Sequence, residues 1–369
     1  MGCVVRIAEV LKKVPGVGKG KDMENDRALY PSKKLKIFFW IILGSLSVFF
    51  AEVISGSDMF PFFTIWGLLI IFPVYTLHIL VLSHIVFNYG KPRFYPLFIA
   101  GAIFGMYEAY LTKVLWNPAW GDAFVSLGGI AIIETILLVL FWYSFMSFII
   151  PLFVGESILT GSRGIVNGLP NVIRDLFTSR KATYIILILF AVLSGIFQSA
   201  NSPSPMHSLL SGLSTTAVLL FLIYLWRTKT KGKEYSIQML LPDKREFSIL
   251  VTLLIVMYVV MGIFIRPEAL PGATPQLIIW IIYAGLFTIL FFHLKKSKNM
   301  DLPESITTPI KFSWKILILL SLLFTISSAF TELIAGSFGN IIMLIFWIVD
   351  CIIGISVFFL SIKDLISNF

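Results

Sequence analysis

Ten stretches of about 18 or more predominantly apolar residues limit what this chain can fold into. A helix needs about 20 such residues to cross the roughly 30 Å hydrocarbon core of a bilayer. Because lipid offers no partner to free backbone groups, each stretch is predicted to be a transmembrane helix. The predicted spans are residues 36–55, 60–87, 94–116, 124–154, 183–200, 207–226, 247–266, 277–294, 313–334 and 340–362. We therefore predict an all-α, polytopic integral membrane helix bundle of about ten helices, with residues 36–366 forming its transmembrane domain.

The composition excludes a water-soluble protein. Hydrophobic residues make up 57% of the 369 residues, charged residues only 13%, and the mean hydropathy is +0.91. So little charge could not cover such a surplus of apolar side chains in water. The connectors between the predicted spans are too short for a folded soluble domain, so the function must lie within or against the bilayer.

The basic residues, which give a formal net charge of +9, fall on alternate connectors. This alternation is typical of cytoplasmic loops and not of nucleic-acid binding. It predicts that both termini are cytoplasmic, that residues 1–35 form a basic cytoplasmic segment and that the protein lies in the cell membrane. The basic connectors contain Lys91, Arg93, Arg163, Arg174, Arg180, Lys181, Arg227, Lys229, Lys231, Lys233, Lys244, Arg245, Lys295, Lys296, Lys298 and Lys311.

Two local features modify this simple bundle. Apolar residues at helical spacing within residues 163–178 indicate an amphipathic helix on the membrane surface, or a linker packed on the bundle. Pro73 and Pro151, in or at the end of the two long early spans, predict a tilt or kink in those helices.

One internal similarity is notable. The sequence from Phe50 to Ser57 closes the first span and that from Phe330 to Ser337 closes the ninth, and both contain Glu followed by Gly-Ser. The degenerate stretch from Phe190 to Gly195 closes the fifth span. The spacing is compatible with a parallel four-span duplication, or with the common use of Gly and Ser at helix ends.

Carboxylates within the spans are the candidate functional groups. Ionisable groups in a membrane need a partner or a watery cavity. Glu108, Glu134 and Asp350 are expected about 12–15 Å below the outer ends of their spans. Lys113 is the nearest cation to Glu108 in sequence, and Glu52 and Glu332 lie nearer the outer boundary.

Two interpretations of these carboxylates remain open. In the first, they line one outward-opening polar cavity that binds a cation, a proton or a small polar solute. In the second, each is neutralised or hydrogen-bonded separately and only fixes helix packing.

No metal, cofactor or disulfide is predicted. The chain has only two cysteines, Cys3 and Cys351, which are not expected to meet, and four histidines without metal-ligand spacing. Aromatic runs such as Phe141-Trp142-Tyr143 are expected to face lipid or anchor the helix at the interface.

The stretch from Gly105 to Lys113, followed by Asn117-Pro118-Ala119-Trp120, resembles a segment of uncharacterised prokaryotic multi-pass membrane proteins. The turn from Glu52 to Gly56 shares the likeness, which covers the first four spans and implies no activity. Glu108-Ala109 with Lys113 is distantly similar to the Glu-Glu-x-x-x-Arg signature of CAAX-type intramembrane proteases. Ala109 replaces the second Glu and Lys113 replaces the Arg, and no pair of later intramembrane histidines completes a water-activating site.

Three functional hypotheses follow. The first is a transporter or permease-like protein that uses the carboxylates as an intramembrane site for a cation, proton or small polar solute. The second is an intramembrane enzyme acting on a lipid, a lipid-linked molecule or a peptide, and the third is a membrane scaffold subunit. Membrane lipids are expected partners and nucleic acids are not. Transport is favoured over enzymatic activity by fold-level analogy alone, and the sequence leaves the substrate and the oligomeric state open.

Overall fold

The computed structural model describes residues 30–300, 312–335 and 338–367, so residues 1–29, with Cys3 and most of the predicted N-terminal segment, lie outside the described part. The described chain is an all-α bundle in which nine helices are long and apolar enough to cross a membrane. The first half contains α3 (Lys33–Val48), η2 (Phe49–Val53), η3 (Gly67–Ile71), α4 (Phe72–Tyr89), α5 (Phe94–Gly105), α6 (Tyr107–Tyr110), β1 (Ser126–Leu127), β2 (Ile130–Ala131), α7 (Ile132–Thr135), η4 (Ile136–Ile149), α8 (Ile150–Leu159), α9 (Gly164–Asn167) and α10 (Asn171–Leu176). The second half contains α11 (Arg180–Ser199), α12 (Pro205–Thr230), α13 (Ile237–Leu240), α14 (Lys244–Phe264), η5 (Pro267–Ala269), α15 (Ala273–Lys298), α16 (Trp314–Ala335) and α17 (Gly339–Ile366). Of the η elements, η2, η3 and η4 are wide π-helices, and η5 is a single 3-10 turn.

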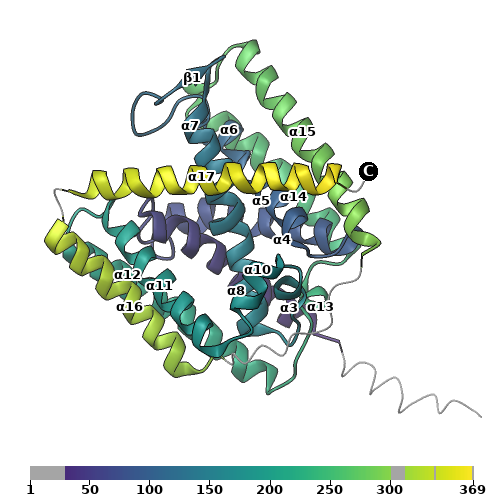
Figure 1. Ribbon diagram of the computed structural model, residues 1–369, viewed down its shortest axis with the longest axis vertical. Helices are drawn as coiled ribbons and strands as arrows, with labels where there is room; N and C mark the ends of the chain where they lie inside the picture. The colour runs from purple at the N-terminus through teal and green to yellow at the C-terminus, as the bar shows by residue number, and fades with distance from the viewer. Residues whose placement is uncertain (1–29, 301–311, 336–337, 368–369) are drawn as a thin grey trace, which may run out of the picture.

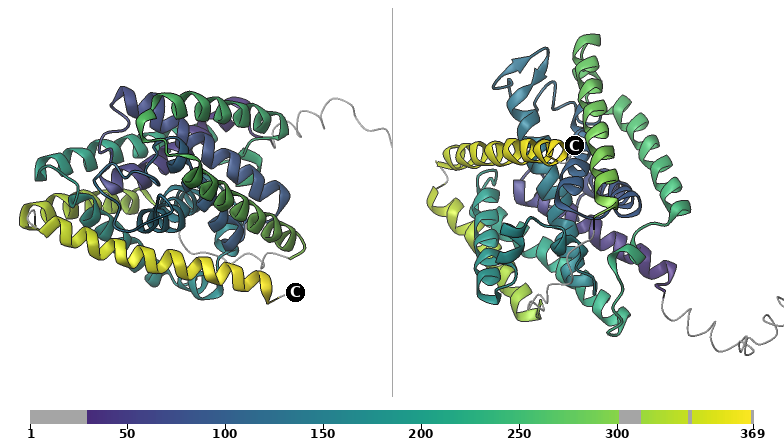
Figure 2. Two further views of the ribbon diagram at one scale, coloured as in Figure 1. Left: turned by 90° about the horizontal axis from the view of Figure 1, so that it is seen from above. Right: turned by 45° about the vertical axis from the view of Figure 1, so that its right-hand side comes forward.

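The centre of the bundle is formed by early elements of the chain. Helix α5 packs along η4, and α3 packs against both α4 and α8. Helices α14 and α15 cover one side through α4 and α5, while α16, packed between α11 and α12, lies on the other side (Figure 1). The last helix, α17, crosses η4, as the turned views also show (Figure 2). The most buried side chains therefore belong to the first 160 residues, roughly where the sequence predicts the first four spans.

The connectors rich in Lys and Arg meet at one end of the bundle, which we call the basic end. Lys36 at the start of α3 pairs with Glu246 at the start of α14. Lys296 at the end of α15 pairs with Asp364 at the end of α17 (2.7 Å). The predicted alternation of connectors is thus present in the fold, whereas the orientation of the basic end toward the cytoplasm stays a prediction.

The connectors poor in Lys and Arg meet at the opposite end. The Asn201 side chain, after α11, donates a hydrogen bond to the Ser55 carbonyl after η2 (2.7 Å). Arg266, after α14, donates to the carbonyl of Thr112 (3.2 Å). The chain therefore does pass from the basic end to the opposite end between Phe94 and Thr112.

This third crossing is not the continuous helix predicted for residues 94–116. Helix α5 has only 12 residues, α6 adds one turn, and the backbone from Leu111 is irregular, with Lys113 at a φ of 60°. Every residue of α5 except Tyr95 is buried. Non-helical backbone is tolerated at membrane depth only where protein surrounds it, so nine long helices and this interrupted one account for the ten predicted crossings.

Other local features of the structure bear on the sequence predictions. The helix of the fourth crossing begins at Ile132 and not at residue 124, because Gly128 and Gly129, with φ of 60° and 77°, turn the chain into the β1–β2 hairpin. The segment 163–178 forms two short helices, α9 and α10, on either side of Pro170. At Pro73 and Pro151 the chain changes from a π-helix to an α-helix, and the predicted tilt or kink stays a prediction.

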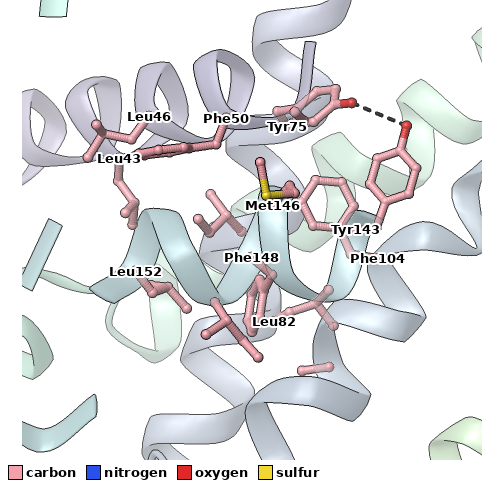
Figure 3. Packing of buried hydrophobic residues seen from close by; sticks show 14 of the residues in the cluster. Leu43, Leu46, Phe50, Tyr75, Leu82, Phe104, Tyr143, Met146, Phe148 and Leu152 are labelled. Atoms are coloured by element: carbon pink, nitrogen blue, oxygen red, sulfur yellow. Dashed lines mark hydrogen bonds between the residues drawn. The ribbon is translucent and has the colours of Figure 1, made fainter. Parts of the chain in front are cut away.

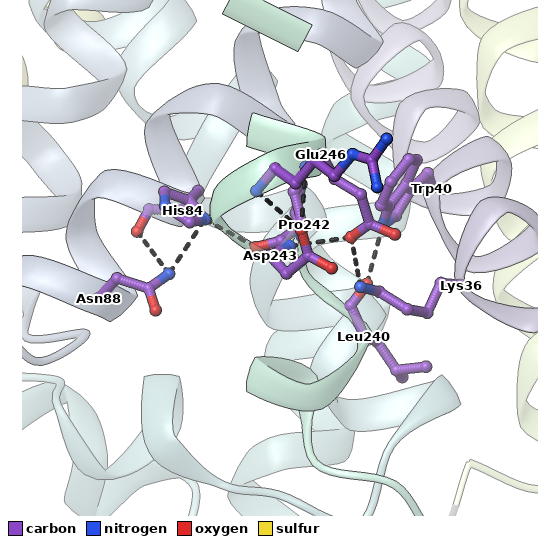
Figure 4. Close-up of polar contacts among 9 residues, drawn as sticks. Lys36, Trp40, His84, Asn88, Leu240, Pro242, Asp243 and Glu246 are labelled. Atoms are coloured by element: carbon purple, nitrogen blue, oxygen red, sulfur yellow. Dashed lines mark hydrogen bonds and ion pairs between the residues drawn. The ribbon is translucent and has the colours of Figure 1, made fainter. Parts of the chain in front are cut away.

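A network of polar contacts ties three helices together at the basic end. The Trp40 indole donates to the Leu240 carbonyl (2.8 Å), and His84 contacts the Pro242 carbonyl through its Nδ1 (2.7 Å). Together with the Lys36–Glu246 pair, these contacts link α3 and α4 to the start of α14 (Figure 4).

Helix α14 begins with a capping box in this network. The Asp243 carboxylate accepts from the amides of Arg245 and Glu246, both at 2.9 Å, and Glu246 accepts from the Asp243 amide. The hydrogen bond from the Glu246 amide holds the pKa of Asp243 below its usual value. Because this pKa is depressed in the folded state, the stabilisation is present above the unfolded-state pKa and is lost as pH falls through the folded value.

We expect Asp243→Ala to lower the free energy of unfolding by about 1 kcal/mol at about pH 7. The difference from the unmodified protein should be smaller at about pH 3, which lies below the unfolded-state aspartate pKa of about 3.9, because the stabilisation declines as pH falls toward the depressed folded value. Unfolding in mixed micelles, followed by circular dichroism at both pH values, measures this difference. Asp122→Ala, on an exposed loop at the opposite end, is the control. A loss that is equal at both pH values would contradict the assignment.

Candidate functional site: a tyrosine–carboxylate cluster

Three tyrosine hydroxyls meet in the centre of the bundle. The hydroxyl oxygens of Tyr107 and Tyr143 are 2.6 Å apart, and the Tyr75 oxygen lies 3.2 Å from that of Tyr143 and 3.3 Å from that of Tyr107. Figure 3 shows the Tyr75–Tyr143 contact above the packed apolar core that contains Phe104 and Met146. A buried tyrosine hydroxyl requires a partner, and here each hydroxyl finds the other two.

A glutamate lies at each side of this tyrosine group. Tyr75 donates to Oε1 of Glu52, and Tyr143 donates to Oε1 of Glu108. The second oxygen of each carboxylate accepts from a hydroxyl of its own segment, Ser57 for Glu52 and Thr112 for Glu108. We call Glu52, Tyr75, Tyr107, Glu108 and Tyr143 the tyrosine–carboxylate cluster.

The local backbone explains why these side chains converge. Glu52 lies on η2 and Tyr143 on η4, both with wide turns, while Glu108 lies on α6 where the third crossing is interrupted. A Cβ at Gly105 would lie 2.9 Å from Cα of Val139 and 3.0 Å from Cβ of Tyr143, so only glycine allows α5 to end against η4. This close approach sets Glu108 beside Tyr143.

The cluster is closed except at one edge. Tyr75, Tyr107, Tyr143 and Glu108 expose between 1% and 6% of their surfaces. Glu52 is only partly buried, and its partner Ser57 is exposed at the opposite end of the bundle. A continuous series of hydrogen-bonding groups therefore runs from that surface, through Glu52 and the tyrosines, to the buried Glu108.

Lys113 does not join the cluster, although it is the cation nearest to Glu108 in sequence. Its ammonium group donates to the carbonyls of Gly262 (2.7 Å) and Ile265, at the end of α14. A cation at a helix C-terminus satisfies the last carbonyls and the helix dipole. Within the described chain, the side chains that donate hydrogen bonds to Glu52 and Glu108 are Ser, Thr and Tyr hydroxyls and include no Lys, Arg or His.

Glu134 and Asp350 occupy a different place from the cluster. Glu134 lies two to three turns before Tyr143 on the same helix, roughly 10–14 Å away along its axis. It is fully buried, accepts from the Phe124 amide through Oε1 (3.0 Å), and its Oε2 has no hydrogen-bond partner within the described chain. Asp350 is buried on α17, the helix that crosses η4. The hydrogen bonds of Glu108 thus lead to Glu52 and not to these two carboxylates.

The remaining predicted residues stay apart from the cluster. Glu332 lies near the end of α16 and is half-buried. Within the described ranges, no group of three or more His, Cys, Asp and Glu residues could hold a metal ion.

The expectation that the Phe141-Trp142-Tyr143 run faces lipid is wrong for its last two residues. Trp142 is 7% exposed, and its indole donates to the Ala51 carbonyl (3.2 Å). Tyr143 is 3% exposed within the cluster. The Trp142 indole has its partner on η2 and the Tyr143 hydroxyl has its partner on α6. Because both partners belong to other segments, the sequence of one span could not predict these contacts.

Sequence reasoning also missed a structural carboxylate. Glu156, at the end of α8, is fully buried and accepts from the amides of Gly164 (2.8 Å) and Ile165 (2.9 Å). It closes the connector between α8 and α9. In the sequence, only the position of this glutamate eight residues before a Gly-Ile pair could have indicated the contact, and that spacing is not specific enough to predict it.

The fold and the cluster define a multi-pass integral membrane protein with a buried, hydroxyl-linked pair of carboxylates. The family described as "Uncharacterized membrane protein family" matches residues 41–366. An "Uncharacterized protein" of Archaeoglobus fulgidus is 37% identical over 275 residues, which cover 74% of this chain and 82% of that relative. No solved structure matches the chain. The chain therefore belongs to this uncharacterised membrane protein family, as the resemblance of its first four spans implied.

Proposed function

We propose that the protein is a transporter of the cell membrane whose transport is coupled to a proton bound in the tyrosine–carboxylate cluster. The observation that carries this proposal is the hydroxyl-linked connection between Glu52 and Glu108. Proton relays of this kind, built from acidic side chains inside a bundle, are a recognised use of intramembrane ionisable groups.

Charge balance supports a bound proton. Two carboxylates joined through hydroxyl groups in a low-dielectric interior repel each other strongly when both are ionised. The described hydrogen-bond partners of both groups are neutral hydroxyls, so a proton or a small cation is needed to balance one of the charges. The tyrosine hydroxyls offer a path by which such a proton exchanges between Glu52, near the surface, and Glu108, in the interior.

The wide turns of η2 and η4 add a mechanical argument. Wide π-type turns are frequent at functional sites, and here η2 carries Glu52 while η4 carries Tyr143. A change of either segment to regular α-helix would rotate its side chains and break the path between the two carboxylates. Protonation and helix geometry are thereby linked, as coupled transport requires.

A second candidate function, an intramembrane enzyme acting on a lipid, is favoured by one observation. An apolar cavity includes Phe49 and Phe50 in its wall, on the same short segment as Glu52. A scaffold is less well supported, because fully partnered carboxylates would be expected and Oε2 of Glu134 has no partner in the described chain.

Infrared difference spectroscopy tests the bound proton. Between acidic and alkaline buffer, the purified protein should show a protonated carboxyl band that shifts when water is exchanged for deuterium oxide. We expect Glu108→Gln to remove this band and Tyr143→Phe to shift it, because the phenol donates to that carboxyl group. Tyr224→Phe, at an exposed tyrosine of α12, is the matched control. A band that persists unchanged in both Glu52→Gln and Glu108→Gln would refute the proposal.

A further inference from the structure

An apolar cavity of about 370 Å³ lies on the side of the bundle away from α14 and α15. Its wall is formed by α3, η2, η4, α8, α11, α12 and α16, with residues of the connector that contains α10. Leu46 and Phe50, both visible in Figure 3, belong to this wall. The volume falls within the usual range of small-molecule pockets.

The cavity wall offers hardly any free polar group. Its hydroxyl-bearing residues are Ser194, Thr216 and Ser321. Thr216 donates to the Gly212 carbonyl (2.5 Å) and Ser321 to the Leu317 carbonyl (2.9 Å), so both hydroxyls are occupied by their own helices. A buried water needs two to four polar partners, so this wall is suited to hydrocarbon and not to water.

The cavity ends beside cationic side chains at the basic end. A smaller pocket that includes Arg163 shares four of its lining residues, Phe153, Phe177, Leu187 and Phe312, with the cavity. Arg227 donates to the Phe312 carbonyl (2.6 Å), so its guanidinium also lies at this end.

A third arginine is placed by the short helix α10. Arg174 lies between Ile173 and Phe177, which both line the cavity, and its buried Nε has no hydrogen-bond partner in the described chain. Val172 on the same helix is 81% exposed, which fits a helix lying at the lipid interface. Arg163, Arg174 and Arg227 thus each lie beside residues that line the cavity, at the basic end of the bundle.

We propose that this cavity binds a hydrocarbon chain of an anionic membrane phospholipid, whose phosphate lies against Arg163, Arg174 and Arg227. Guanidinium groups match phosphate oxygens in charge and geometry. The apolar wall takes the chain, and the arginines select the headgroup. The site is separate from the proposed proton coupling, and neither proposal depends on the other.

Photocrosslinking in lipid nanodiscs tests the site. The probes are phosphatidylglycerol and phosphatidylcholine with identical chains, each carrying a photoreactive group in one chain. We expect the anionic lipid to label peptides of α11 and α16 that line the cavity, and native mass spectrometry to show its retention about tenfold above that of the zwitterionic lipid. Equal labelling and retention of both lipids would overturn the proposed selectivity.

Two kinds of variant separate the chain site from the headgroup site. Ala191→Phe places a ring in the cavity and should reduce labelling about tenfold, whereas Val256→Phe, on the exposed face of α14, should not. Ser321→Phe fills the cavity from α16 and is the second variant to use if Ala191→Phe does not fold. Arg163→Gln with Arg174→Gln should abolish the preference for the anionic lipid, and Arg245→Gln, exposed at the same end, should preserve it. Undiminished labelling in both cavity-filled variants would show that only surface lipid is captured, and would refute the site.

Discussion

Glu108→Gln should reduce proton-coupled transport about 100-fold, the effect typical of removing a positioned proton-transfer group. Glutamine keeps the size of the side chain. Its amide oxygen can still accept from Tyr143, and its NH2 group can donate to the Thr112 hydroxyl, so the bundle should remain folded. It cannot bind the exchangeable proton, however, and the path from Glu52 then ends at the tyrosines. The loss therefore separates proton coupling from structural integrity.

The measurement uses proteoliposomes that contain an internal pH indicator. Gradients of sodium, potassium, lithium or magnesium ions are imposed in turn, and proton movement is recorded with the unmodified protein and with Glu108→Gln. Glu268→Gln, at an exposed position of η5, is the control and should behave as the unmodified protein. Identical proton movement with and without Glu108 under every gradient would remove the cluster from any coupling role.

Glu156→Ala should lower the free energy of unfolding by about 3 kcal/mol, because it leaves two backbone amides, those of Gly164 and Ile165, without their charged acceptor. Glu156→Gln keeps one acceptor oxygen and should lose less. Unfolding in mixed micelles measures the global effect, and hydrogen exchange at Ile165 reports local opening of the connector. Glu234→Ala, exposed near the same connector, should change neither quantity. If Glu156→Ala matched that control, the carboxylate would have no structural role.

The architecture was largely predictable from the sequence, since apolar length and the placement of basic residues both follow from the properties of the bilayer. Lys36, Arg227 and Lys296 do lie at one end of the bundle, as the alternation of connectors implied. The interruption after Gly105 was not predictable, because residues 94–116 satisfy the criteria for a continuous helix. The irregular backbone there is satisfied by distant segments, because the Met106 carbonyl accepts from Tyr283 of α15 and the Leu115 carbonyl accepts from the Ala131 amide.

The site was predictable in part. Glu52 and Glu108 were both singled out because carboxylates are rare in lipid, but depth alone does not say which helices are neighbours. The sequence therefore left open whether the three predicted interior carboxylates share one cavity, whereas the structure links Glu108 to Glu52 through Tyr75 and Tyr143. Tyrosine in an apolar run is ambiguous, because the same residue anchors helices at the interface and donates hydrogen bonds in the core.

The shortness of α5 has a consequence for biogenesis. Its 12 residues extend only about 18 Å, well below the hydrocarbon thickness, so this segment is a poor candidate for independent insertion by the translocon. The carbonyls of Met106 and Thr112 accept from Tyr283 on α15 and from Arg266 after α14, so both would lack these partners until the later helices were in place. Synthesis of this protein therefore calls for α5 to be held by its neighbours, or by the insertion machinery, until the later helices have left the ribosome.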